Sequence, residues 1–114
     1  MIDYYKEAIA ALETVLPVHY EMALHSGTET PCISIQERNN AVVINGDTIG
    51  YSRFSFTVKV WGNDIAALQM YAIQIDNVLR PLGFVRISSG ELYDNQSAMI
   101  QKILAYECLA IEEF

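Results

Sequence analysis

The side chains that most often carry catalysis are few in this chain, and their spacing matches no recognised catalytic or metal motif. His19 and His25 are separated by a predicted strand and turn, with no acid or thiol beside them at metal-ligand spacing. No serine lies in a GxSxG motif, and none can be assigned a histidine and carboxylate partner. The glycines are scattered at predicted turns, so the chain has neither a P-loop nor a GxGxxG dinucleotide turn.

Two local pairs of acids are the remaining candidates for general acid–base chemistry. Glu91 and Asp94 lie in GELYDN, and Glu112 and Glu113 lie near the end of the chain. Such chemistry requires surroundings that raise the pKa of one carboxyl group above that of the other. No apolar pocket is apparent around either pair, so we expect a solvated turn and a solvated tail. The sequence therefore predicts no enzyme, no cofactor and no metal site.

The composition predicts one globular domain spanning residues 1–114. Hydrophobic residues make up 52% of the chain and charged residues 18%, which is too apolar for a disordered protein. No apolar run reaches the roughly 18 residues needed to span a bilayer. The N-terminal MIDYYKEAIAALETVL contains acids and lacks the basic flank of a signal peptide, so we expect synthesis in a cytoplasm and no membrane partner.

The charge balance disfavours sequence-reading nucleic-acid binders. Fourteen acids and seven bases give a net charge of −7, which repels a phosphate backbone. Cys32 and Cys108 lie in apolar or strand-like segments, and neither belongs to a CxxC motif. We expect them to be buried, reduced thiols rather than a disulfide.

The segment YSRFSFTVKVWG, residues 51–62, predicts a strand well beyond the usual length of about 5–6 residues. Its alternation places four apolar side chains on one face: Phe54, Phe56, Val58 and Val60. The other face carries Tyr51, Arg53 and Trp61 along a polar row. For Trp61 two interpretations are equally open, because the indole can cover the core at the start of the second helix or contact a partner protein.

A β-hairpin is predicted just before this strand. Asn45-Gly46 lies between β-rich runs and favours a two-residue turn, which would pair Val42–Ile44 with Asp47–Ile49. Gly50 would permit a bulge or bend that takes the hairpin out of the main sheet. Its apolar side chains need cover, so we expect residues 41–50 to be exposed or mobile until assembly orders them.

The remaining elements predict an α+β fold. One helix begins at Asp3 and ends before Pro17, and a second spans residues 64–80 after a cap at Asn63 or Asp64. Short strands are expected at residues 18–22, 32–37 and 84–88, and polar turns at 25–31 and 89–96. Residues 97–111 fit either a helix or a strand, and the strand is favoured. Together these elements predict a single antiparallel or mixed sheet of four to five strands, with both helices on one face and a protruding hairpin.

The order of these motifs resembles the tail terminator (tail completion) proteins of long-tailed bacteriophages and prophage-like particles. The resemblance covers nearly the whole chain: LPVHYEM, TPCISIQE, the strand ending in VKVWG with a helix directly after it, and LRPLGFVRISSGELYDNQSAMIQKILAYECL. It implies a small virion subunit that assembles as a ring, usually a hexamer, on the last ring of the tail tube. Such a ring stops tube growth and provides the head–tail joining surface.

The resemblance also implies partners and an interface. The partners are further copies of the chain, the tail tube protein and the head connector, while DNA passes through the lumen without sequence-specific binding. The protein would lie in the tail–neck region of the virion, after assembly in the host cytoplasm. We expect the long strand and its hairpin to contact a neighbouring subunit or the tube through Val42, Val43, Ile44, Asn45, Gly46, Asp47, Ile49, Tyr51, Arg53 and Trp61.

Two alternatives remain open. Other neck and head-closure proteins of the same particles share this size and composition. A ferredoxin-like regulatory domain that dimerises around a small molecule is the other alternative, although no loop of this chain supplies convergent polar groups for a ligand.

Overall fold

The computed structural model describes residues 4–20, 29–44, 49–94 and 99–113, and side chains at 4–20, 29–38, 53–93 and 99–108. The elements follow in the order α1 (Tyr4–Leu12), β1 (Val18–Tyr20), β2 (Cys32–Ile44), β3 (Ile49–Gly62), α2 (Ile65–Leu79), the 3-10 turn η2 (Arg80–Leu82), β4 (Val85–Asp94) and β5 (Met99–Glu113).

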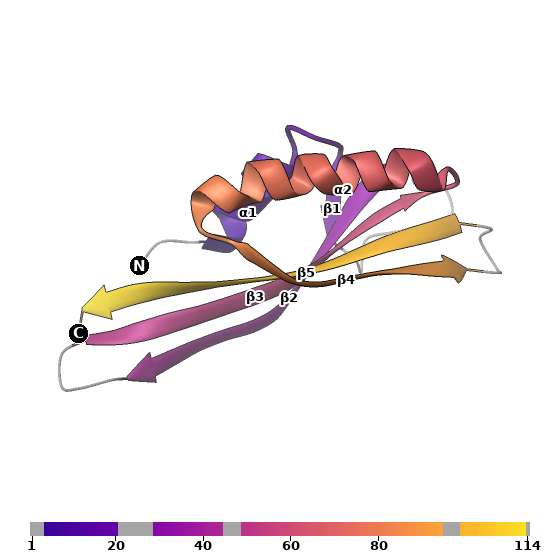
Figure 1. Cartoon of the computed structure of the whole chain (residues 1–114). Helices are drawn as coiled ribbons and strands as arrows, with labels where there is room; N and C mark the ends of the chain where they lie inside the picture. Colours follow the sequence, from indigo (N-terminus) through magenta and orange to yellow (C-terminus); the bar gives the residue numbers. More distant parts are fainter. Residues whose placement is uncertain (1–3, 21–28, 45–48, 95–98, 114) are drawn as a thin grey trace.

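The five strands form one mixed sheet in the order β1-β2-β3-β5-β4, and α1 and α2 both pack on one of its faces (Figure 1). β1 runs parallel to β2, and every other neighbouring pair is antiparallel. The predicted α+β architecture is therefore confirmed. The ambiguous segment at residues 97–111 is a strand from Met99 onward, as favoured by its period of two.

The core lies between the helices and the sheet, and the predicted register of β3 is confirmed. Phe54, Phe56, Val58 and Val60 are all 3% exposed or less. Phe56 packs edge-on against Phe84, with ring centroids 5.1 Å apart. Burial of these four side chains on one face explains why the strand alternates so regularly, since a slip of one residue would turn all of them to solvent.

The junction between β3 and α2 is tightly built. Asp64 caps α2, and its Oδ1 accepts a hydrogen bond of 3.1 Å from the backbone N–H of Ala66. Gly62, the last residue of β3, lies so close to α2 that an added Cβ would be 2.9 Å from Cδ2 of Leu68. The missing side chain therefore lets the first turn of α2 lie close to the end of the strand.

The predicted hairpin register is wrong. Val42, Val43 and Ile44 pair with Ser52, Tyr51 and Gly50, rather than with Asp47–Ile49. The predicted Asn45-Gly46 turn lies outside the described residues. The β2–β3 ladder shifts register between Glu37 and Asn39, whereas Gly50 pairs regularly with both of its neighbours.

The turn predicted at residues 89–96 is also wrong for its first part, because β4 continues to Asp94. Residues Ser89 to Asp94 pair in sequence with Leu104 to Met99 of β5. Their polar composition resembles a turn, but a paired neighbouring strand satisfies the backbone groups and keeps the segment extended.

The sheet continues past the helices as a three-stranded extension, formed by residues 39–44 of β2, 49–53 of β3 and 109–113 of β5. Ile49 pairs with Glu113 and Arg53 with Leu109, while Ile44 pairs with Gly50. Figure 1 shows this extension running out beyond the helix layer, and the molecule accordingly measures 52 × 25 × 21 Å. The predicted protruding hairpin is thus two strands of the main sheet, with β5 as a third.

Candidate assembly surfaces

The residues predicted to form an interface fall in two separate places. Val42–Ile44, Ile49, Tyr51 and Arg53 lie on the extension, and the side chain of Arg53 is exposed. Asn45, Gly46 and Asp47 lie outside the described residues. The extension therefore brings most of the described members together.

Trp61 lies apart from them, at the other end of β3 and about 26 Å from Arg53 at the usual rise per strand residue. Its indole Nε1 donates a hydrogen bond of 2.9 Å to Oγ of Ser34, which is fully buried. Alternation places Trp61 on the face opposite Val60, and so opposite the helices. It covers the helix-free side of the sheet instead of the start of α2, and its polar atom satisfies a buried hydroxyl.

The helix-free face of β2 and β3 is polar and partly cationic. Gln36, Glu37, Arg38, Thr57 and Lys59 line an open depression of about 490 Å³ there. The depression is wide and solvated, so it cannot enclose a small ligand.

A second surface, which the sequence analysis did not identify, lies along α2 and β4. Eight exposed large apolar residues lie on α2, η2 and β4: Ile65, Met70, Ile73, Leu82, Val85, Ile87, Leu92 and Tyr93. We call these residues the α2–β4 flank. The four on β4 are 58–64% exposed, and β4 is an edge strand. The signal in the sequence was the apolar content of FVRIS, predicted as a short strand, and of Leu92-Tyr93, predicted as part of a polar turn.

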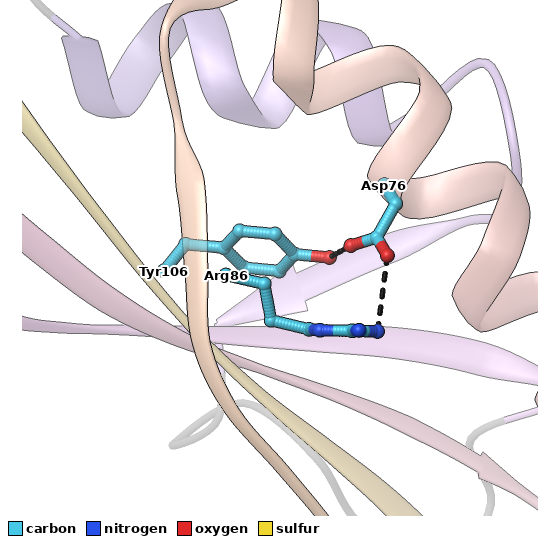
Figure 2. Close-up of polar contacts among 3 residues, drawn as sticks. All are labelled: Asp76, Arg86 and Tyr106. Carbon is cyan, nitrogen blue, oxygen red and sulfur yellow. Dashed lines mark hydrogen bonds and ion pairs between the residues drawn. The ribbon is translucent and has the colours of Figure 1, made fainter.

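The charged side chains that the structure describes on β4, Arg86 and Glu91, are paired within the chain. Arg86 Nη1 lies 3.0 Å from Oδ2 of Asp76, and the hydroxyl of Tyr106 donates a hydrogen bond to the other oxygen of that carboxylate (Figure 2). Lys102 Nζ lies 3.0 Å from Oε1 of Glu91. These contacts tie β4 to α2 and to β5.

These contacts determine the ionisation of Tyr106 and Glu91. Burial raises the pKa of Tyr106 far above its usual value, and the hydrogen bond to Asp76 and the charge of that carboxylate raise it further. The phenol therefore stays protonated and donates, which makes it unsuitable as a base. The hydrogen bond from Lys102 lowers the pKa of Glu91, so this carboxylate stays ionised.

The depression beside this cluster has a volume of about 280 Å³ and is lined by Asp76, Arg80, Phe84, Val85, Arg86 and Tyr106. Both carboxylate oxygens of Asp76 are already bound, one by Arg86 and one by Tyr106. We interpret the cluster as a structural link between layers rather than as an acid–base pair.

The thiols and acids elsewhere offer no other reactive centre within the described part of the chain. Cys32 and Cys108 are free and buried, and burial raises the pKa of both thiols, which lowers their reactivity. No group of three His, Cys, Asp or Glu side chains among the described residues could hold a metal ion. No described helix has both the length and the apolar character needed to cross a bilayer.

Comparison with known proteins identified no relative: no protein-family model and no curated protein matches the chain.

Proposed function

We propose that this protein is a tail terminator, which caps the tail tube of a long-tailed phage or prophage-like particle as a ring, stops tube growth and offers the joining surface for the head. The observation that carries this proposal is the three-stranded extension. Residues 50–53 of β3 pair with β2 on one side and β5 on the other, so this part of the backbone is held in extended form outside the helix layer.

An extension of this kind suits contact with another protein. Both of its faces lie beyond the helices, and its sequence carries Val42, Val43, Ile44 and Ile49. Apolar residues on a projecting sheet are stabilised when a partner covers them. In the proposed assembly, the extension binds a neighbouring subunit or the terminal ring of the tube.

Ring closure explains how such a subunit limits growth. In a cyclic array each subunit uses its two lateral surfaces on its neighbours, so no lateral site is left open. The outer face of the ring differs from that of a tube ring, and the next tube subunit finds no complementary surface. The net charge of −7 favours passage of DNA through the ring without tight binding.

Capping can be measured directly on growing tubes. Purified tube protein from the same particle is polymerised with and without this chain, and tube lengths are recorded by electron microscopy. We expect lengths to shorten at a ratio of about one ring to each tube end, with the chain found at one tip. Growth that is unaffected by the chain would contradict termination, and tip binding without arrest would favour a head-closure or connector role.

A further inference from the structure

We propose that the α2–β4 flank binds the β1–β2 edge of a second copy of this chain, so that the sheet continues head to tail from one subunit to the next. This inference rests on the proposed ring and names the lateral surfaces that build it. The interface residues predicted from the sequence lie between residues 42 and 53 and at Trp61, and none of them belongs to this flank.

Exposure is the first reason. Of the nine exposed large apolar residues in the described part of the chain, eight lie on the flank and the ninth, Tyr20, lies on β1. β4 and β1 are the two edge strands of the sheet. The exposed apolar side chains therefore lie mainly on the flank, with Tyr20 at the opposite edge, and a continued sheet would cover those on β4 and β1.

Strand direction is the second reason. β4 is antiparallel to β5, β5 to β3, and β3 to β2, while β1 is parallel to β2. A strand added antiparallel to β4 thus has the direction of β1 and β2. In a second copy with the same orientation, β1 and β2 run in this direction. The β1–β2 edge of that copy can therefore pair antiparallel with β4 of the first copy.

Backbone availability is the third reason. β1 covers β2 only at Ile33–Ile35, and no described strand pairs with the outer edge of β2 from Gln36 to Ile44. The outer edge of β4 likewise has no partner among the described strands. Unpaired strand edges of similar length therefore lie on opposite sides of one sheet, and such edges bind other strands readily.

Charge is the fourth reason. Two copies of a chain with net charge −7 repel each other in general, so a self-association surface must be locally neutral. The charged residues in the described side chains of β4 are Arg86 and Glu91, and each is paired internally, with Asp76 and Lys102. Among the described side chains of β4, which end at Tyr93, no charge is therefore left uncompensated.

Charge-insertion variants test the two edges separately. The β4 variant carries Ile87→Lys and Leu92→Lys, the β1 variant carries Tyr20→Lys, and the control carries Gln74→Lys on an exposed position of α2. Each lysine makes the chain less acidic, so weaker association cannot arise from greater overall repulsion. Sedimentation velocity over a range of concentrations reports the assembly state, and circular dichroism reports folding.

We expect the wild-type chain and the control to form oligomers larger than a dimer. Each edge variant alone should associate at least about tenfold more weakly. An equimolar mixture of the two variants should form a 1:1 heterodimer, because each retains one intact edge and the two intact edges are complementary. Formation of this heterodimer also shows that both variants are folded.

Three results would overturn the inference. The first is a wild-type chain that stays monomeric at all concentrations, and the second is a β4 variant that assembles like wild type. The third is a dimer that is weakened only by the β4 substitutions, which would indicate symmetric β4–β4 pairing. The experiments distinguish a wrong flank interface from a wrong proposed function. A β4 variant that still arrests tube growth would refute the flank alone, whereas a chain that assembles through the flank without affecting tubes would refute termination alone.

Discussion

At the scale of single residues, the cluster of Tyr106, Asp76 and Arg86 shows how a polar group is accommodated at the edge of this core. Tyr106 is almost fully buried and stacks on Phe56, and its hydroxyl reaches a carboxylate of α2 that also pairs with Arg86 of β4. A buried hydroxyl without a hydrogen-bond partner destabilises the folded state, so this hydrogen bond helps to position α2 on β5.

Tyr106→Phe removes the hydrogen bond to Asp76 and leaves the ring packing in place. We expect a loss of about 1.5–3 kcal/mol in the free energy of unfolding, the usual range for a hydrogen bond to a charged group. Urea denaturation near pH 8 measures the loss. Tyr93→Phe, at an exposed tyrosine of β4, is the matched control and should change stability by less than about 0.5 kcal/mol.

The same residue predicts alkaline sensitivity. The folded-state pKa of Tyr106 is raised above its ordinary value of 10.0, so the native state holds this proton more tightly than the unfolded state. Its contribution to stability is complete below about pH 10 and is lost as the pH rises above that value. Tyr106→Phe should therefore flatten the fall in stability above pH 10, with a smaller fall remaining because burial also raises the pKa of Tyr5. An equally steep fall in both proteins would contradict this assignment.

At the scale of elements, the sequence predicts those helices and strands that bury only one face in the core. β3 alternates because Phe54 to Val60 face the helices, and α2 repeats by three and four because Leu68, Ala72, Ile75 and Leu79 are buried. The second half of β4 has no such pattern. It is extended because β5 pairs with it, and a non-local partner leaves little trace in the local sequence. The register of β2 with β3 was wrong because Ile44 pairs with Gly50, so the connection is longer than the two residues that Asn45-Gly46 predicts.

The contact between β3 and α2 gives a prediction with a built-in control. Gly62→Ala places a methyl group 2.9 Å from Leu68 Cδ2, and Leu68 is 1% exposed, so its side chain has little room to move. We expect a loss of about 1–3 kcal/mol from overpacking. Gly90→Ala has no heavy atom within 4 Å of the added carbon and should be nearly neutral. Thermal or urea denaturation compares the two, and equal effects would mean that the junction is not tightly packed.

The extension predicts a pattern of hydrogen exchange. Strands of the core lie beneath the helices, whereas residues 41–44 and 49–50 lie outside them. In the isolated chain we expect amides of Val42–Ile44, Ile49 and Gly50 to exchange faster than those of Phe54–Val60, and to slow when the chain binds a tube end. Mass spectrometry of deuterated fragments measures both states. Strong protection of the extension in the isolated chain would show that it needs no partner.

At the scale of the whole molecule, the sequence predicts association in place of catalysis, and the predicted contact residues do not include the α2–β4 flank that we propose as an interface. The four flank residues on β4 are apolar like those of the core, and they are exposed because β4 is an edge strand. For Trp61 the sequence left core cover and partner contact equally open, and the structure shows its indole half-buried and hydrogen-bonded to Ser34. Both outcomes depend on strand order, which local patterns do not encode.

The order of helices and strands can be compared with that of a ferredoxin-like fold. β3, α2 and β4 form a split unit with β5 between the strands, as in half of such a fold, but α1 precedes β1 instead of linking two strands. We propose a ring rather than a ligand-binding dimer, because the chain is acidic, its sheet projects past the helices, and both sheet edges lack a partner among the described strands.

The most direct test of tail termination is the length distribution of tails made without this protein. The gene is deleted from a lysogen that produces the particle, and tail lengths in the lysate are measured by electron microscopy, with the restored gene as control. We predict full heads separate from tails, and tails of widely varying length that return to one length on restoration. Joined particles with normal tails after the deletion would contradict the account, and unjoined tails of normal length would assign the protein to head closure instead.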